Sequence, residues 1–249
     1  MQGSEPGDLF VAPPPASSYR AEIGADPGKL THRSFDSASF WKIHPECLAA
    51  TMRAAKLLES LGHTVEDSYP EALFDPGLGG PQTSALNRDL VMLVRGLGEI
   101  LGRPATRDDF EPYLWSVTEL PSATADEYIA ARQWVLRWRR RVVQWWSAGF
   151  ELLLTPTVWE PPATLESMAP VEGKLGKLFA KVMRHVFFTS PFNITGQPAI
   201  SLPLHWTPDG LPVEVQLVAA MGREDVLIRI ASQLEQELPW IDRLPPVHA

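Results

Sequence analysis

Hydrophobic residues recur along this chain at two spacings, one typical of helices and one typical of strands. Between Pro45 and Leu61 they return every three or four positions, and Gly62 follows as a helix stop. A second helical pattern covers about 82–101 and ends at Gly102. The stretch HTVEDSYP between these two patterns is typical of a short strand. The first half of the chain therefore predicts alternating helix and strand.

A third helix begins at Thr124, whose hydroxyl is placed to cap the amide of Glu127, and it stops near Gly149. Its large apolar residues form one stripe, whereas most of its arginines lie elsewhere on the helical wheel. The stripe consists of Trp134, Trp138, Val142 and Trp145, and the arginines are Arg137, Arg139, Arg140 and Arg141. Aromatic rings beside arginines are suited to stacking on nucleic-acid bases. The alternative is a core stripe with a solvated cationic flank, and the net charge given below favours it.

The last hundred residues read as strands and helices in turn. FELLLTPT is typical of a buried strand, 160–176 of a loop, and 177–188 of a short helix. The run AISLPLHW and the run LPVEVQLVAA predict two strands joined by the turn Thr207-Pro208-Asp209-Gly210. A helix over 224–238 follows and ends at Pro239. These patterns predict an α/β fold in layers.

The N-terminal residues differ from the rest in composition. The segments APPPASS and GADPGK within residues 1–29 are rich in proline and glycine, which disfavour a regular backbone ladder. We therefore expect an extended N-terminal arm or linker over 1–29. The remaining residues, 30–249, are numerous and apolar enough to form one α/β domain.

Charge and cysteine content exclude several classes of protein. With 22 Lys and Arg against 30 Asp and Glu, the formal net charge is −8, which repels nucleic acids and anionic membranes. The single cysteine, Cys47, cannot form an internal disulfide, and no apolar run reaches the roughly 20 residues of a membrane helix. The opening MQGSEPGDLF lacks the order of a signal peptide. We expect a cytoplasmic protein with neither a nucleic-acid partner nor a membrane partner.

Several motifs together resemble the C-terminal part of the amidase signature family of amide hydrolases. They are FNITGQPAISLPL, DGLPVEVQLV, LEQELPW, HPECLAATMRAAKLLESLGHTVE and LLLTPT. The resemblance covers nearly the whole chain. Within the family, the chain resembles members that act on linear or cyclic amides. It implies a mixed β-sheet between α-helical layers, hydrolysis of amide C–N bonds, and no cofactor. One departure is Glu214, where the family usually has glycine; a carboxylate there implies a strand end near solvent.

The resemblance also implies a catalytic triad that this chain does not show. Family members use a lysine, a serine in a cis peptide and a nucleophilic serine within a Gly- and Ser-rich stretch. The pair Ser17-Ser18 follows three prolines, and PGLGGPQTS at 76–84 lacks the required order of serines. None of the six lysines lies in a catalytic context of the family. The sequence therefore predicts the C-terminal portion of an amidase, with no catalytic residue and no activity alone.

By the same resemblance, two rigid segments are expected to form a wall of the substrate pocket. They contain Thr155, Pro156 and Thr157, and then Phe192, Asn193, Thr195, Gly196 and Pro198. These residues would shape the pocket without taking part in the reaction. The alternative is that Thr195 to Pro198 only turn a helix into a strand, and glycine and proline suit both interpretations.

Other candidate sites are weaker. Ser201 and His205 are expected on one face of a strand, but their separation of roughly 13 Å is too long for a nucleophile and its base. His44 and Cys47 are spaced like two metal ligands without a second pair, so a capping histidine and a buried cysteine are favoured. The carboxylates Asp108, Asp109 and Glu111 are typical of a solvated helix start. No metal is expected.

Three hypotheses about function remain. The first is a part of an amide hydrolase that acts on a small-molecule amide only when a separate N-terminal half is supplied. The second is a non-catalytic binding or structural subunit, or remnant, that complements such a half. The third hypothesis is an independent hydrolase. Because half of a sheet leaves an edge uncovered, we expect poor solubility of the chain alone, or association with a second copy or with the other half.

Overall fold

The computed structural model describes residues 5–8, 11–34, 43–119, 123–169 and 175–244. These residues cluster into two compact units, which are described separately. The sheet unit combines Met1–Tyr69, Trp145–Ala163 and Arg184–Ala249, and the helical unit combines Pro70–Gln144 and Thr164–Met183. The boundary at residue 29 and the single domain over 30–249 stay predictions.

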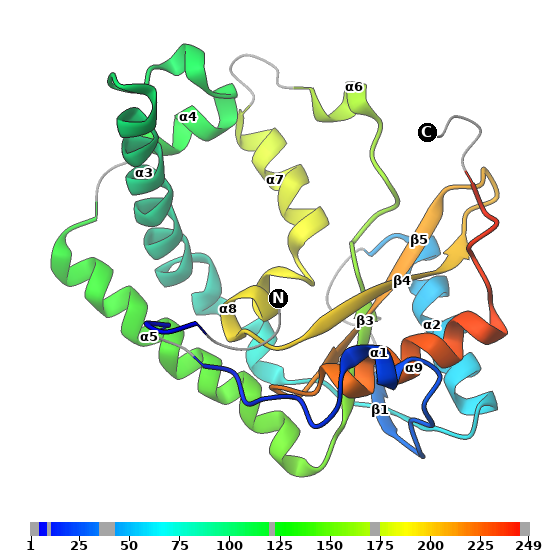
Figure 1. Cartoon of the computed structure of the whole chain (residues 1–249). Helices are drawn as coiled ribbons and strands as arrows, with labels where there is room; N and C mark the ends of the chain where they lie inside the picture. The colour runs from blue at the N-terminus through cyan, green and yellow to red at the C-terminus, as the bar shows by residue number, and fades with distance from the viewer. Residues whose placement is uncertain (1–4, 9–10, 35–42, 120–122, 170–174, 245–249) are drawn as a thin grey trace. The chain divides into compact units, whose positions relative to one another are not determined.

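The sheet unit is built on a mixed sheet of five strands in the order β2-β1-β3-β5-β4 (Figure 1). The strands are β1 (Thr31–Ser34), β2 (Thr64–Asp67), β3 (Leu152–Pro156), β4 (Ala199–Trp206) and β5 (Pro212–Ala219). β1 runs parallel to β2 and to β3, whereas β5 is antiparallel to both β3 and β4. The predicted hairpin between β4 and β5 is therefore present.

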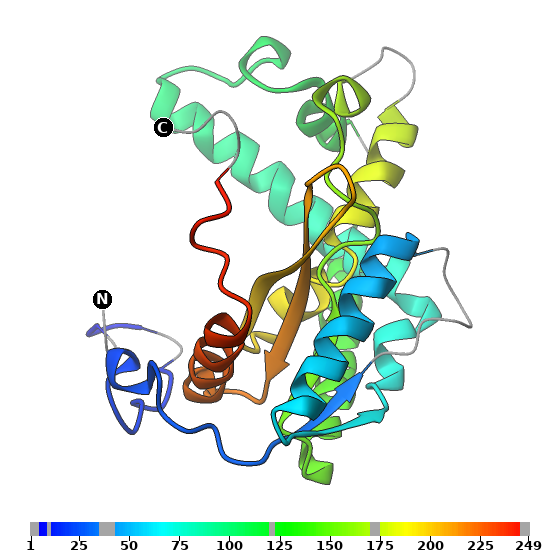
Figure 2. The same cartoon turned by 90° about the vertical axis from the view of Figure 1, so that its right-hand side faces the viewer.

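Helices cover both faces of this sheet. They are α1 (Tyr19–Glu22), α2 (Pro45–Ser60), α8 (Ser190–Thr195) and α9 (Glu224–Glu237). α2 contacts β3, β4 and β5, and α9 contacts β4 and β5 from the same side (Figure 2). On the other face, the Gln216 side chain of β5 donates to the Phe188 carbonyl, just before α8. The predicted mixed sheet between α-helical layers is confirmed.

The core of the sheet unit is centred on β3. Leu152, Leu153 and Leu154 are fully buried because β3 has a neighbour on each side and helices above and below. α2 turns Ala50 and Leu58 toward the sheet, also without exposed surface. Burying each leucine side chain contributes about 1.5–3 kcal/mol of stabilisation.

The helical unit contains α3 (Pro81–Leu101), α4 (Pro112–Thr118), α5 (Ala125–Gln144), α6 (Leu165–Met168) and most of α7 (Leu175–Val186). Short 3₁₀ turns lie at Glu71–Phe74, Pro76–Gly79 and Arg107–Asp109, and a fourth, Trp145–Ala148, follows α5 in the sheet unit. α5 begins as predicted: the Glu127 amide donates to the Thr124 hydroxyl at 3.2 Å, and the Glu127 carboxylate accepts from the Thr124 amide at 2.7 Å.

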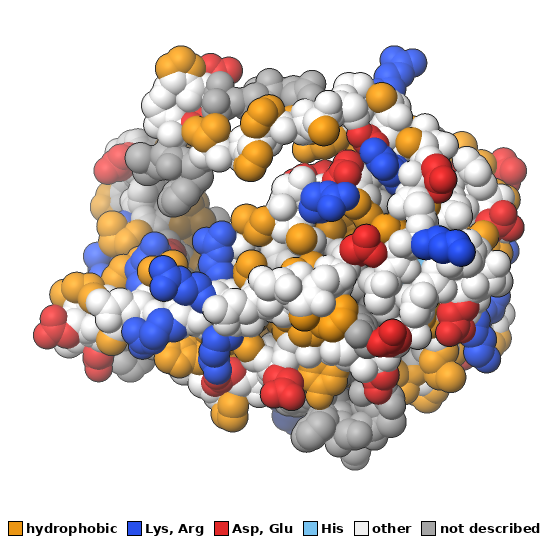
Figure 3. Space-filling view, turned by 90° about the horizontal axis from the view of Figure 1, so that it is seen from below, with side chains coloured by type: hydrophobic (Ala, Val, Ile, Leu, Met, Phe, Trp, Pro, Cys, Tyr) orange, Lys and Arg blue, Asp and Glu red, His pale blue; other side chains and the backbone are white. Residues whose placement is uncertain are grey.

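The stripe on α5 is a core stripe. Trp138 and Val142 are fully buried, whereas Arg137, Arg140 and Arg141 are exposed. Figure 3 shows Lys and Arg side chains along α5, at the left of that view, interspersed with apolar ones. The buried indole of Trp138 donates to the Ala72 carbonyl at 2.6 Å, within the same unit. The interpretation of a solvated cationic flank is confirmed for the described part of α5.

Five short elements differ from the sequence expectation: the strand β1 and the helices α1, α4, α6 and α8. One turn of helix, α1, lies inside the segment expected to be extended, and Arg229 of α9 bonds Glu22 of α1 at 2.5 Å. α6 lies inside the expected loop over 160–176, and α8 was not expected at all. Helices of four to six residues carry too few periods to show in a hydrophobic pattern. No helix in the described ranges is long and apolar enough to cross a membrane.

Candidate functional site

Polar side chains line one face of the sheet where β3 ends. The register places Thr155 opposite Gln216, and Gln216 opposite Ser201, so these three share a face. Glu214 is two residues from Gln216 along β5, and Thr157 is two residues beyond Thr155, so both fall on the same face. We call these five residues the polar row.

The inner end of the polar row is closed. The Gln216 amide, only 3% exposed, donates to the Thr155 hydroxyl at 3.1 Å and to the Phe188 carbonyl at 2.9 Å. The Thr155 hydroxyl donates in turn to the Pro156 carbonyl at 2.9 Å. A buried amide without partners is costly, so these bonds fix β3 and β5 to the segment that leads into α8.

The outer end of the polar row is open to solvent. The Ser201 hydroxyl donates to the Glu214 carboxylate at 2.7 Å, and Thr157 Oγ1 lies 2.8 Å from Ser201 Oγ. A carboxylate can only accept, and serine has one hydroxyl proton, so Thr157 donates to Ser201. Ser201 and Glu214 are exposed, whereas Thr157 is 7% exposed. The exposure of Glu214 agrees with the expectation that its strand end lies near solvent.

The residues of the predicted pocket wall lie at the end of β3, on α8 and just before β4. Thr155 and Thr157 belong to the polar row, whereas Pro156 pairs with Val215 and lies on the opposite face. Four wall residues, Phe192, Asn193, Thr195 and Gly196, form α8 and its cap, and Pro198 precedes β4. Gly196 has φ +74°, in the left-handed region that favours glycine, and its amide caps α8 on the Phe192 carbonyl at 2.8 Å.

Burial separates these residues into two groups. Phe192 and Thr195 are buried, and Asn193 and Gly196 are exposed. The bond from Gln216 to Phe188 gives the β3 segment and the α8 segment a common anchor. Both segments are therefore held rigidly, and their role as a wall of a substrate pocket stays a prediction.

The expectation that Ser201 and His205 share a face is wrong. The ladder between β4 and β5 shifts between Leu202 and His205, so that His205 lies opposite Val213, on the face of Leu202. Pro203 within this shift has no amide to donate to the ladder, which explains a bulge here. The shift reverses the alternation and turns His205 away from Ser201.

His205 is instead held by α2. Its Nε2 lies 2.6 Å from the Glu46 carboxylate, and its Nδ1 lies 3.2 Å from the Arg53 guanidinium. Because arginine only donates, Nδ1 accepts and Nε2 carries the proton toward Glu46. This histidine has a structural role between helix and sheet, and it is not a base for Ser201.

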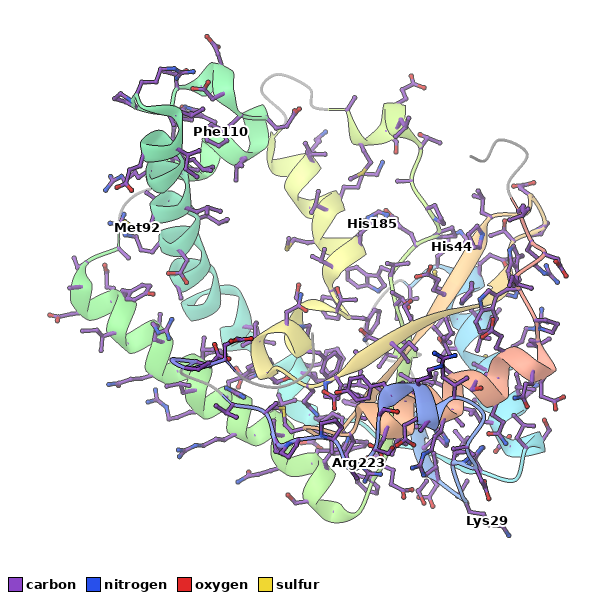
Figure 4. All side chains as sticks on the ribbon, viewed as in Figure 1. Lys29, His44, Met92, Phe110, His185 and Arg223 are labelled. Carbon is purple, nitrogen blue, oxygen red and sulfur yellow. The ribbon has the colours of Figure 1, made fainter. Side chains whose placement is uncertain are left out.

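The remaining candidates have structural roles. His44, labelled in Figure 4, caps α2 by accepting the Glu46 amide at Nδ1 (3.2 Å). Cys47 is fully buried, and burial raises the pKa of its thiol to about 12. Asp109 caps a 3₁₀ turn at Thr106 and pairs with Arg103 at 2.6 Å. No group of three or more metal-ligating side chains occurs among the residues that the structure describes.

The serine pair near the N-terminus lies at the start of α1. The Ser17 hydroxyl bonds the Glu22 carboxylate, and Ser18 occupies the N-cap position of α1. Within the described part of the chain, the side-chain hydrogen bonds of Ser17 and Ser201 involve no lysine or histidine. Lys42, Lys174 and the side chain of Ser84 lie outside the part of the chain that the structure describes.

The sequence reasoning missed the partnership of Ser201 with Glu214 and the anchoring role of Gln216. The available signal was the alternation in VEVQLV, which places Glu214 and Gln216 on one face between buried valines and a leucine. The partners across the sheet depend on register, which a single strand does not reveal.

Comparison with known proteins identifies the family. The family model described as Amidase matches residues 89–228. The 6-aminohexanoate-cyclic-dimer hydrolase of Pseudomonas sp. (strain NK87) is 39% identical over 98% of this chain and 51% of its own length. The enzyme of the same name from Paenarthrobacter ureafaciens is 38% identical over the same shares. The chain thus spans about half the length of the curated relatives it matches.

Solved structures give the same result. A structure of 6-aminohexanoate cyclic dimer hydrolase superposes with a TM-score of 0.90 at 35% identity, over 98% of this chain and 52% of that one. A bacterial aryl acylamidase shares the fold, with a TM-score of 0.69 at 16% identity. With the family model, these matches leave one conclusion: the chain belongs to the amidase signature family.

Proposed function

We propose that this chain is the C-terminal portion of an amide hydrolase, which acts only when a second segment supplies the nucleophile and its base. One observation carries the proposal: 98% of the chain matches amide hydrolases, yet it spans only 51% of their length. The chain would supply the polar row and the α8 segment as one side of a pocket. The catalytic serines and lysine would come from the other half.

The contacts of Ser201 support inactivity of the chain alone. A serine nucleophile needs a base that removes its proton, usually a histidine or a neutral lysine. Ser201 instead donates to a solvated carboxylate, which is a weak base near neutral pH. Acyl transfer also needs amides directed at the developing oxyanion, and the Gly- and Ser-rich stretch expected to carry them is not in this sequence.

The family and the relatives support a proposal about the substrate class. We propose linear or cyclic amides derived from amino acids, because two relatives are named for hydrolysis of the cyclic dimer of 6-aminohexanoate. The net charge of −8 supports a small-molecule substrate over nucleic acid. We also propose a cytoplasmic location, on the sequence features given above.

Complementation tests the proposal. The chain is co-expressed with the half of the Pseudomonas relative that it does not match, and release of primary amine from 6-aminohexanoate cyclic dimer is followed. Hydrolysis is expected from the pair and from neither half alone. Absence of hydrolysis by a pair that co-purifies would contradict the proposed activity.

The second candidate is a non-catalytic binding subunit, favoured by the ordered polar row in a chain without a recognisable nucleophile. It predicts ligand binding without turnover, even in a complemented pair. The third hypothesis, that the chain is an independent hydrolase, predicts turnover by the pure chain. Ser201→Ala and Ser18→Ala variants would then identify the nucleophile.

A further inference from the structure

Glu214 is oriented by a hydrogen bond, and within the described part of the chain no cationic side chain pairs with it. Its Oε2 accepts the Ser201 hydroxyl at 2.7 Å, and Ser201 is fixed in turn by Thr157 at 2.8 Å. No Lys, Arg or His among the described residues forms an ion pair with Glu214. The chain thus presents an oriented anion at the exposed end of the polar row.

Four other carboxylates of the sheet unit do have a cationic or imidazole partner. Glu22 pairs with Arg229, Asp225 with Arg223, and Glu160 with Arg184. Glu46 is engaged by His205. An exposed carboxylate usually moves freely in water, whereas Glu214 is tied to a hydroxyl that a nearly buried threonine anchors. This arrangement restricts the carboxylate before any ligand arrives, which reduces the cost of ordering on binding.

The complementary group is a compact cation with several hydrogen-bond donors. A carboxylate with one oxygen already engaged retains accepting positions on both oxygens. A primary ammonium offers three donors and a full charge, whereas carboxylate and phosphate groups would be repelled. Thr157 and Ser201 have no donor left for an anion, because their hydroxyl protons are both engaged within the row.

We propose that Glu214, oriented by Ser201, binds the ammonium group of an aminoalkanoate ligand. The inference rests on the proposed function, because hydrolysis of a cyclic amide of amino acids releases a chain with a free amine, protonated at neutral pH. Glu214 lies on the same face as Thr155 and Thr157 of the predicted pocket wall. It therefore sets a preference for ligands that carry an amine, and it is a binding residue with no part in bond cleavage.

Equilibrium binding to the full 249-residue chain tests the inference. The probes are 6-aminohexanoate, its N-acetyl derivative and hexanoate, titrated by NMR or calorimetry. We expect binding of 6-aminohexanoate, and about tenfold or greater weakening for the other two because both lack the ammonium. Equal affinities for all three, or no binding of 6-aminohexanoate, would overturn the inference.

Matched variants locate the site. Glu214→Gln keeps size and hydrogen bonding but removes the charge, and it should weaken 6-aminohexanoate about tenfold or more. Glu235→Gln, an exposed glutamate of α9, is the control for net charge and should change nothing. Ser201→Ala should weaken binding less than Glu214→Gln, and Ser201→Thr, which keeps the hydroxyl, should restore it. Identical affinities for Glu214→Gln and the wild type would place the amine elsewhere and refute the assignment.

Folding of each variant is checked by circular dichroism and thermal unfolding. Binding is measured on this chain by itself, whereas the proposed function is measured by turnover in a complemented pair. The Glu214 binding site and the proposed hydrolase function can therefore be refuted separately. A pair without turnover whose chain still binds 6-aminohexanoate through Glu214 supports the binding site alone. A pair with turnover whose chain discriminates none of the probes refutes the site alone.

Discussion

The most unusual single residue is His32, a histidine buried in the sheet core. It has no exposed surface, and neither ring nitrogen has a hydrogen-bond partner in the described structure. The ring of His63 lies edge-on at 5.0 Å, while its own nitrogens bond the Leu30 amide and Gln233. Burial and the neighbouring His63 lower the pKa of His32 to about 3, so it is neutral in the folded protein.

This histidine predicts acid sensitivity. The unfolded chain binds a proton at His32 below about pH 6.5, while the folded protein does so only near pH 3. Its contribution to the free energy of unfolding is therefore complete above pH 6.5 and is lost as the pH falls from there toward 3. The loss is about 3 kcal/mol at pH 4.

The measurement is urea unfolding between pH 7 and pH 4, for the wild type and for His32→Leu. The carboxylates titrate in both proteins, so the difference isolates His32. The variant should lose less stability over this range. If the free energy of unfolding falls equally with pH in both proteins, His32 accepts a proton in the folded state without loss of stability, which would contradict the prediction.

Cys47 gives a second prediction at this scale. Because burial raises its pKa to about 12, thiolate is about a thousandfold scarcer than in a thiol of pKa 9. A disulfide reagent at pH 8 should modify the chain slowly, and rapidly after addition of urea. Fast labelling of the native protein would contradict the burial of this side chain.

At the scale of elements, the start of α5 is fixed by reciprocal bonds between Thr124 and Glu127. Thr124→Ala removes the hydroxyl that caps the helix, and it should lower the free energy of unfolding by about 1 kcal/mol. Denaturant titration measures the change. Ser147→Ala, at an exposed position without such bonds, is the control and should leave stability unaltered.

Long periodic helices and the β4–β5 hairpin could be predicted from the sequence because each carries a local signal. α2, α5 and α9 have caps or stops beside an apolar stripe, and Gly210 marks the turn. The bulge at Pro203 could not be predicted, since proline fits a bulge, a strand start or an edge equally well. The sequence prediction assumed that side chains alternate between the two faces of β4 through Pro203, and it therefore assigned His205 to the wrong face.

The candidate site was predictable only in its separate segments. The TPT segment and the α8 segment were identified by resemblance, but the bonds that join them run through Gln216 and Phe188. Likewise, Ser201 meets Glu214 across 13 residues of sequence because of the ladder register. Such cross-strand partners follow from tertiary packing, which local sequence does not determine.

At the scale of the whole chain, the sheet ends in β4, an eight-residue strand with one neighbour within the described sheet. The opposite edge, β2, has four residues and carries Glu66 and Asp67, which discourage pairing with another chain. β4 contains no Asp, Glu, Lys or Arg, so it is the edge suited to a partner. The purified chain should therefore self-associate or aggregate.

Sedimentation velocity measures this prediction over a range of protein concentrations. Addition of the complementing half should reduce self-association, because the same edge would then be occupied. A monodisperse monomer that unfolds in one cooperative transition would contradict the view that the chain is an incomplete fold.

The central claim, that this chain shapes a pocket whose nucleophile lies on another segment, is tested most directly by covalent labelling. A fluorophosphonate reacts with an activated serine, and mass spectrometry of the complemented pair shows which segment carries the label. We predict a label on the complementing half and none on this chain, with or without its partner. A label on Ser201 or Ser18 would show that the chain carries its own nucleophile and would contradict the account.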